Sequence, residues 1–262
     1  MIGRRAVITL LGGAATAWPL GASAQMTKRI WRLGMLETTA LNTNTVNFNS
    51  LRRALLEFGY IDGDNLIIEY RSADGVSERF TDLAAELVHL QVDLIVTRGT
   101  PATLAAENAP GTTPVVAVAL SRPLAVVANL ARPTGKVTGL ASLASELAGK
   151  RMEILKEMVP HITRIAMMFN SQNPTLAHMQ QELEAAARTL GLQHELVDVW
   201  QREDIEPAFE FASRHADAML AGIETVTEAN RALVAELAVK YRLPAIYAAR
   251  EYIQAGGWLA SE

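Results

Sequence analysis

The chain has 262 residues, half of them hydrophobic, with 24 Lys and Arg against 28 Asp and Glu. This length and composition exclude a disordered or fibrous protein, and the formal charge of −4, without any run of basic residues, predicts no nucleic-acid partner. Cysteine is absent, which excludes disulfides, thiolate chemistry and Cys-ligated metal sites.

The first residues have the layout of a signal peptide. A pair of arginines, Arg4-Arg5, precedes an apolar stretch at 6–20, and the small-residue pattern Ala22-Ser23-Ala24 follows it. This leader resembles the twin-arginine type of signal, whose cargo can fold before it crosses the membrane. The stretch is shorter than the about 20 apolar residues that a membrane-spanning helix needs. We therefore predict a signal peptide at 1–24, cleaved after Ala24, and a periplasmic mature protein.

From residue 30 onward, short apolar runs alternate with amphipathic segments, which is typical of a mostly parallel sheet covered by helices. Predicted strands, each short and rich in Val, Ile or Leu, lie at 30–36, 65–71, 93–97, 114–120 and 137–140. A helix predicted at 46–58 places four apolar residues on one face, namely Phe48, Leu51, Leu55 and Phe58. Ser77 is expected to cap the next helix, whose buried stripe begins at Phe80.

The alternation restarts after a Gly- and Pro-rich passage at 132–139. Further strands are predicted at 164–169, 194–199, 218–222, 245–248 and 257–260. Further helices are predicted at 145–159, 174–190, 205–214 and 226–241. The sequence therefore predicts two doubly wound, Rossmann-like α/β lobes, an N-terminal lobe at 25–140 and a C-terminal lobe at 141–262, with a cleft between them.

Motifs for cofactor, metal or hydrolytic chemistry are missing from the mature chain. It contains neither G-x-G-x-x-G nor G-x-x-x-x-G-K-[ST], the two glycine-rich patterns of nucleotide sites. The five histidines form no H-x-x-x-H pair, and G-x-S-x-G is absent. We predict no cofactor, no metal and no catalytic residue. An enzyme stays an alternative, because a Ser-His-Asp arrangement can assemble without a local motif.

Polar residues stand at the ends of the predicted strands, where the loops of parallel sheets face a common crevice. The candidate ligand-binding residues, drawn from both lobes, are Glu37, Thr38, Gly99, Thr100, Ser121, Arg122, Asn170, Glu224, Tyr247 and Arg250. Gly99 before Thr100-Pro101 would let backbone N–H groups approach a ligand, although the same pattern also suits an ordinary strand-to-helix turn. Tyr247 suits either stacking on a ligand ring or filling the hinge, and we favour the hinge.

Several further motifs are informative in combination. They are the twin-arginine leader, Leu55-Leu56-Glu57-Phe58-Gly59-Tyr60, Ile68-Glu69-Tyr70-Arg71, Gly99-Thr100-Pro101-Ala102, Ala131-Arg132-Pro133-Thr134-Gly135, Lys150-Arg151 with Leu155-Lys156-Glu157-Met158-Val159-Pro160, and Ile246-Tyr247-Ala248 with Arg250-Glu251. Together these motifs resemble the substrate-binding proteins of ABC transporters. The resemblance implies a type I periplasmic-binding-protein fold that closes on a small-molecule solute and delivers it to an ABC permease in the inner membrane. An amino acid or related small carboxylate is the expected solute, partly by this resemblance and partly because helix N-termini suit carboxylates.

This sequence departs from the family pattern at two places, and each departure leads to a prediction. An acidic Gly-Asp-Pro-type turn commonly follows the fourth strand in this family, whereas this chain has Ser121-Arg122-Pro123, which favours a more anionic ligand. Family members also usually continue beyond Gly257 through a helix that returns to the first lobe, whereas this sequence stops at Glu262. The second departure suggests a C-terminally truncated, non-functional paralogue with exposed apolar sheet surface. A ligand-responsive regulator on the same fold is a weaker alternative, because the mature chain has no spare length for a signalling module.

Overall fold

A computed structural model describes residues 29–121, 123, 126, 135–142, 147–171, 173, 176–222 and 224–260. By its contacts the chain divides into two units, Met1–Ile30 and Trp31–Glu262, and all the described helices and strands belong to the second unit. The predicted signal peptide at 1–24 and the candidate ligand residue Arg122 lie outside the described residues.

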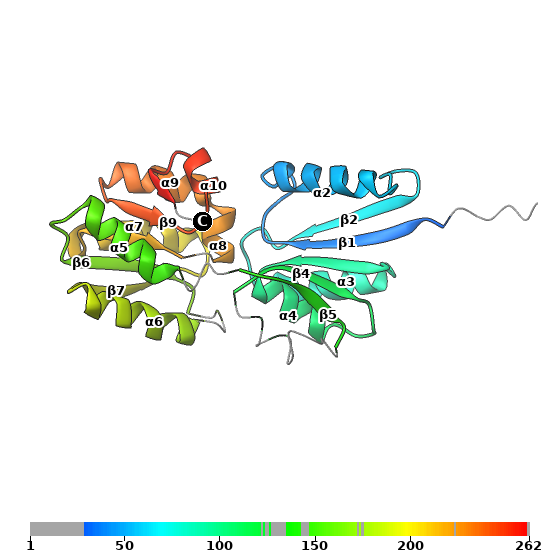
Figure 1. Cartoon of the computed structure of the whole chain (residues 1–262), viewed down its shortest axis with the longest axis horizontal. Helices are drawn as coiled ribbons and strands as arrows, with labels where there is room; N and C mark the ends of the chain where they lie inside the picture. Colours follow the sequence, from blue (N-terminus) through cyan, green and yellow to red (C-terminus); the bar gives the residue numbers. More distant parts are fainter. Residues whose placement is uncertain are drawn as a thin grey trace, which may run out of the picture. The chain divides into compact units, whose positions relative to one another are not determined.

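The first half of the second unit forms a five-stranded parallel sheet with the strand order β2-β1-β3-β4-β5 (Figure 1). Its strands are β1 (Trp31–Glu37), β2 (Leu66–Ser72), β3 (Leu94–Arg98), β4 (Val115–Leu120) and β5 (Val137–Ala141). Its helices are α2 (Thr45–Glu57), α3 (Arg79–His89) and α4 (Thr100–Asn108). Each strand agrees with its predicted range to within one residue at either end, because Gly, Pro and polar residues bound every apolar run.

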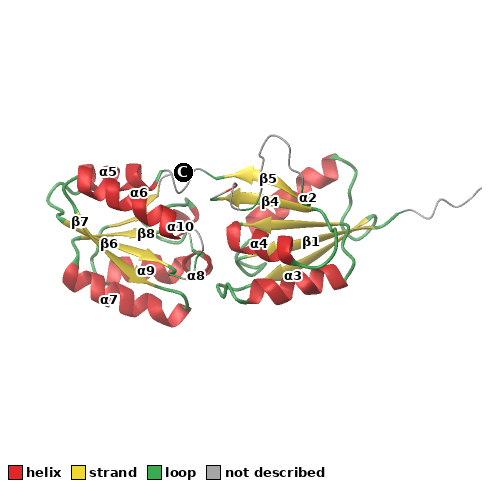
Figure 2. Cartoon of the chain, turned by 90° about the horizontal axis from the view of Figure 1, so that it is seen from below, coloured by secondary structure: helices red, strands yellow, loops and turns green. Residues whose placement is uncertain are grey.

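The second half repeats this topology in a second parallel sheet with the order β10-β9-β8-β6-β7. Its strands are β6 (Arg164–Phe169), β7 (Gln193–Asp198), β8 (Ala218–Ala221), β9 (Ala245–Tyr247) and β10 (Leu259–Ala260). Its helices are α5 (Ala148–Met158), α6 (Leu176–Thr189), the short 3₁₀ helix η2 (Arg202–Asp204), α7 (Ile205–His215), α8 (Thr225–Ala229), α9 (Arg231–Lys240) and α10 (Glu251–Gln254). Helices cover both faces of this sheet, α5 and α6 on one side and α7 and α9 on the other (Figure 2). The predicted α/β fold class with doubly wound parallel sheets is therefore confirmed.

Burial differs between the two sheets. In β6 every residue after Arg164 is buried, and successive side chains enter two core clusters, Met167 with α5 and α6, and Met168 with α7 and α9. The described core cluster of the first sheet packs with α3 and α4. Helix α2 buries none of its residues fully, and Phe58, predicted to share its apolar face, is 79% exposed just beyond the helix end.

Two local predictions are wrong. Helix α3 begins at Arg79, with Glu78 at the N-cap position and no side-chain hydrogen bond there, so Ser77 does not cap it. The helix predicted at 226–241 is two helices, α8 and α9, separated at Asn230. Asn230 ends α8 and begins α9 at a non-helical φ of −113°, and the carbonyl of Val226 accepts hydrogen bonds from both its Nδ2, at 2.9 Å, and its backbone N–H, at 3.2 Å.

Candidate functional site

The topology creates one switch point in each sheet. The strand order reverses between β1 and β3 in the first sheet and between β6 and β8 in the second. In open α/β sheets ligands bind outside the carboxyl ends of the strands at such points. These ends carry Thr38 after β1, Gly99 after β3, Asn170 after β6 and Gly222 after β8. The fold alone therefore predicts that these four positions border a ligand-binding site.

A cavity of about 120 Å³ lies there, lined from both sheets. We call it the switch-point cavity. Five of the predicted ligand-binding residues line it, namely Thr38, Gly99, Thr100, Ser121 and Glu224. Two further lining residues, Arg98 and Thr225, also stand at predicted strand ends. The polar lining residues that the sequence reasoning missed are Ser142, Arg151, Asn173 and Glu228.

The other described candidates lie elsewhere. Glu37 and Asn170 are buried, at 5% and 4% exposure, but neither is among the residues that line the cavity. Arg250 is exposed and also outside the lining. Tyr247 stacks on Tyr252, with ring centroids 4.8 Å apart and planes 6° from parallel, and it borders a separate apolar cavity of about 470 Å³. The ring of Tyr247 therefore already stacks on another ring of the same chain.

The wall formed by the first sheet is built around the start of α4. Gly99 takes the left-handed φ of +80° that glycine tolerates best, and its N–H donates to the carbonyl of Val118 at 2.9 Å. The hydroxyls of Thr100 and Ser121 lie 3.0 Å apart. Since Gly99, Thr100 and Pro101 all line the cavity, the positive end of α4 borders it.

The fourth strand adds a strained position to this wall. Ala119 has a φ of +60°, next to a shift of register between β4 and β5, and it lines the cavity. A residue with a Cβ seldom adopts this conformation, because the Cβ crowds the following carbonyl.

Glu224 is the buried acid in the wall formed by the second sheet. Its side chain is 3% exposed, and its Oε2 accepts a hydrogen bond from Nδ2 of Asn173 at 2.7 Å. Among the described residues, its Oε1 has no hydrogen-bond partner. Burial raises the pKa of this carboxyl to about 7, although hydrogen bonds from Asn173 and from the backbone of Asn170 act against the rise.

Arginines supply the positive charge. Nε of Arg98 lies 3.2 Å from Oε1 of Glu228, and Nη2 of Arg98 lies 3.9 Å from Oε1 of Glu251. Burial lowers the pKa of Arg98, but Glu228, Glu37 and Glu251 together raise it above its ordinary value. Arg151 on α5 is 3% exposed, and burial lowers its pKa. The cavity therefore presents cationic, anionic and hydroxyl groups within a small volume.

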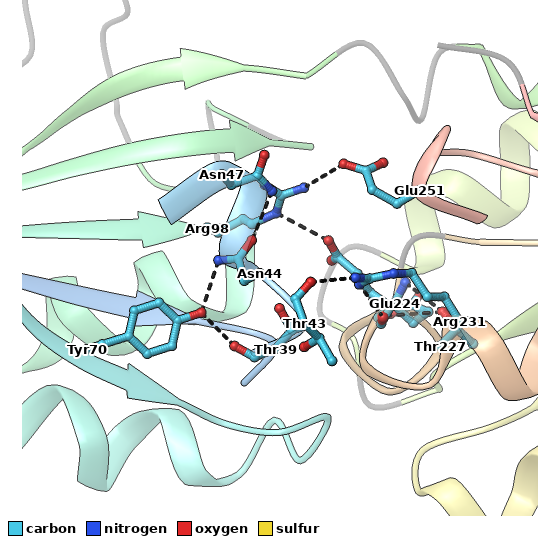
Figure 3. A network of polar contacts seen from close by, with 11 residues as sticks. Thr39, Thr43, Asn44, Asn47, Tyr70, Arg98, Glu224, Thr227, Arg231 and Glu251 are labelled. Carbon is cyan, nitrogen blue, oxygen red and sulfur yellow. Dashed lines mark hydrogen bonds and ion pairs between the residues drawn. The ribbon is translucent and has the colours of Figure 1, made fainter. Parts of the chain in front are cut away.

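Polar contacts also join the segment after β1 to the second sheet (Figure 3). Nη2 of Arg231, at the start of α9, donates to the carbonyl of Thr43 at 2.6 Å. Within the first half, the hydroxyl of Tyr70 on β2 holds the same segment, because it donates to the carbonyl of Thr39 at 2.7 Å and accepts from Nδ2 of Asn44 at 3.0 Å. The bond from Arg231 to Thr43 and the pairing of Arg98 with Glu228 connect the two halves of the unit.

Within the described ranges, no group of three or more His, Asp or Glu is placed to hold a metal ion. No helix in that part of the chain is both long and apolar enough to cross a membrane.

Solved structures share this fold. A conserved domain protein from Vibrio cholerae superposes with a TM-score of 0.79 at 22% identity, covering 87% of this chain and 77% of that chain. An "ABC domain in complex with L-Trp" from Streptococcus pneumonia gives a TM-score of 0.76 at 22% identity, covering 89% of this chain and 79% of the other. The class defined by the two sheets and these likenesses is the type I periplasmic-binding-protein fold, as the sequence predicted.

Sequence similarity gives the family. The profile described as "ABC transporter substrate binding protein" matches residues 38–261, and the chain belongs to that family. The "Tyrosine-binding protein" of Clostridioides difficile (strain R20291) is 31% identical over 121 residues, which are 45% of this chain and 34% of that protein. The matched segment thus spans about a third of this curated relative's length.

Proposed function

We propose that this protein is the extracytoplasmic substrate-binding component of an ABC importer. It binds a small solute between two lobes, 25–140 and 141–262, and delivers it to a permease in the inner membrane. Removal of the leader at 1–24 would place the mature chain in the periplasm. The observation that carries the proposal is the switch-point cavity, which takes its lining from both sheets and holds charges of both signs. Family membership supports the same reading.

For the solute, we propose an amino acid or a related small carboxylate. A carboxylate suits the buried guanidinium of Arg151 and the N-terminal end of α4, where unpaired N–H groups favour negative charge. The hydroxyls of Thr100 and Ser121 add neutral hydrogen-bonding groups beside that helix end. Two similar proteins support this class, because one is named for tyrosine and the other was crystallised with L-Trp.

Import further requires that the protein with bound solute adopt a different conformation from the protein without solute, so that the permease can distinguish the two. A solute stabilises a closed arrangement only by its differential affinity for that arrangement. Contacts to lining residues of both sheets, such as Thr100 and Glu224, would supply this difference.

The test is a thermal-shift and calorimetry screen of the purified protein against L-tyrosine, L-tryptophan, L-leucine and D-ribose. A solute that binds only the folded state raises its stability by about 2.7 kcal/mol at 100 times the Kd. We expect at least one amino acid to raise the melting temperature, and ribose to leave it unchanged. No binding by any of the three amino acids would count against the proposed solute class.

A pair of threonine substitutions locates the site. Thr100→Ala removes the hydroxyl of a residue that lines the cavity, so we expect it to weaken binding about fivefold to tenfold, the usual contribution of one neutral hydrogen bond. Thr189→Ala removes an exposed hydroxyl on α6 that bonds the carbonyl of Ala185, and it serves as the matched control. Equal affinities for both variants and the wild type would place binding outside the switch-point cavity.

A further inference from the structure

A second cavity, of about 470 Å³, lies apart from the switch-point cavity. We call it the apolar cavity. Residues of α5, α9, β9 and the segment 256–258 line it, and among the described residues none lines both cavities. Its lining is mostly apolar, as Leu155, Ala238 and Leu243 illustrate. Pockets for small molecules have such volumes, about 300–1,000 Å³, and are mostly apolar with a few polar groups that orient the ligand.

Large apolar side chains that line this cavity are exposed to solvent. Trp258 is 89% exposed, and Met158 and Val239 are each 60% exposed. They come from the segment before β10, from the end of α5 and from α9. Single exposed apolar residues are common, but several around one apolar cavity mark a surface that binds a partner or ligand. Because these lining residues are themselves exposed, the apolar cavity is accessible from solvent.

A cation stands beside this apolar surface. Arg242, in the turn after α9, is exposed and lines the cavity, and no other charged residue does so among those that the structure describes. Its side chain forms no ion pair or hydrogen bond with a described residue. A guanidinium stays charged at physiological pH and presents several N–H donors in one plane, so it suits a carboxylate. The charge of Arg242 is therefore available to an anionic group of a ligand.

From the volume, the exposed apolar side chains and this cation, we infer that the apolar cavity binds an amphipathic organic anion, a linear aliphatic chain that ends in a carboxylate. The chain lies against apolar residues such as Ala238 and Leu243 and covers Trp258, and the carboxylate pairs with Arg242. This site is additional to the switch-point cavity, which has a smaller volume of about 120 Å³ and charges of both signs in its lining. The inference goes beyond the proposed function and does not depend on it.

A second copy of the chain fits this surface less well. A stable protein–protein interface buries about 1,200–2,000 Å² in total, far more than a few exposed side chains supply. In a two-fold symmetric contact the same surface meets itself, so two copies of Arg242 would enter one interface. The described lining contains no acid that could pair with either of them. A free carboxylate supplies the charge that this surface lacks.

The experiment uses decanoate, octanoate and decanol as probes. Calorimetry of the purified protein at pH 8, where the carboxylates are ionised, measures the affinity for each probe. We expect decanoate to bind at one site. Octanoate is shorter by two methylene groups, so it should bind about 15-fold more weakly if the whole chain is buried. The fluorescence of Trp258 should change on binding, and Trp258→Phe should remove this change.

Two substitutions at exposed positions test the carboxylate and the chain separately. Arg242→Glu replaces an attraction with a repulsion, so it should weaken decanoate about tenfold and change the binding of decanol by less than about twofold. Val239→Glu places a charge in the apolar lining and should weaken both probes at least about fivefold. Arg53→Glu and Val46→Glu make the same changes at exposed positions on α2, outside the lining, and serve as matched controls.

Several results would overturn the inference. They are no binding of decanoate, equal affinity of wild type and Arg242→Glu for it, or an equal loss of decanoate and decanol binding in Arg242→Glu. Sedimentation velocity tests the other occupant, because a dimer that Val239→Glu disrupts, together with no decanoate binding, would assign the cavity to a second copy.

Competition separates the two cavities. An amino acid that binds in the solute screen should leave the affinity for decanoate unchanged, and mutual exclusion would place decanoate in the switch-point cavity and overturn the second site. If no amino acid binds, the proposed solute class fails, while the decanoate titrations of wild type and Arg242→Glu still decide this inference.

Discussion

Glu37 allows a sharp test of buried charge at the end of β1. Its side chain is 5% exposed, and its Oε2 has no hydrogen-bond partner among the described residues. Burial raises the pKa of the carboxyl from 4.5 to about 7, Arg98 acts against the rise, and Glu228 adds to it. The carboxyl therefore ionises more easily in the unfolded chain. Its contribution to stability is intact below pH 4.5 and is lost progressively as the pH rises to about 7.

The size of the loss follows from the two pKa values. Between pH 5 and pH 8 a carboxyl shifted in this way reduces the free energy of unfolding by about 2.5 kcal/mol. Glu37→Gln removes the ionisation, so the variant should lose about 2.5 kcal/mol less than the wild type over the same interval. The raised pKa of Glu224 also lowers the free energy of unfolding with rising pH, and it does so in both proteins. The contribution of Glu37 is therefore the difference between the wild type and the variant.

Urea denaturation at pH 5 and pH 8 measures the effect in the wild type, Glu37→Gln and the control Glu195→Gln, which changes an exposed carboxylate on β7. The control should follow the wild type. If Glu37→Gln loses as much stability as the wild type between the two pH values, then Glu37 ionises normally in the folded protein and the reasoning from burial is refuted.

Three further substitutions test other contacts. Gly139 has a φ of +155°, and Gly139→Ala would place a Cβ 1.9 Å from a carbonyl oxygen of β4. We expect urea denaturation to show a loss of more than about 3 kcal/mol in the free energy of unfolding. The control Gly59→Ala, whose Cβ would meet no atom within 4 Å, should lose about 1 kcal/mol. Asp217 accepts hydrogen bonds from the N–H and hydroxyl of Thr163, and the first of these helps to lower its pKa to about 2. Asp217→Asn should therefore cost about 1–2 kcal/mol at pH 7 and no more than about 0.5 kcal/mol near pH 2, where half of the carboxyl is protonated, and an equal cost at both pH values would contradict this explanation. Arg98→Met removes the cation beside buried acids and should lower the free energy of unfolding by about 3 kcal/mol, whereas an unchanged denaturation curve would show that its ion pairs contribute nothing in solution.

Strand positions were predictable because most strands are short runs rich in Val, Ile, Leu, Ala or Met that are bounded by Gly, Pro or polar residues, although β2 and β7 also contain charged residues. The cavity was partly predictable for the same reason, since Thr38, Gly99 and Thr100 directly follow strand ends and residues at strand ends converge. The helix break at Asn230 was not, because the apolar pattern continues across it and the break appears only in the backbone conformation of that residue.

Arg151 was missed although the sequence contains a signal. The buried residues of α5 are Ala148, Arg151, Met152 and Leu155, which follow the spacing of one helix face. An arginine within an otherwise apolar stripe indicates that the stripe borders something polar. A charged residue on the buried face of a predicted helix is therefore a candidate for the ligand-binding site, and Arg151 meets this criterion. Glu37 was assigned to the ligand because strand-end position alone does not distinguish residues in the lining from residues behind it.

Ala119 has a consequence for the kinetics of binding. A residue with a Cβ at a φ of +60° strains the folded chain by roughly 1 kcal/mol, a strain that glycine would relieve. Glycine would also give this part of the wall access to more backbone conformations, and each of them would have to be given up when a solute arrives. With alanine, the backbone conformation of this part of the cavity wall is already fixed before a solute binds. Such preorganisation reduces the entropy lost on association and leaves the encounter rate closer to the diffusion-controlled value.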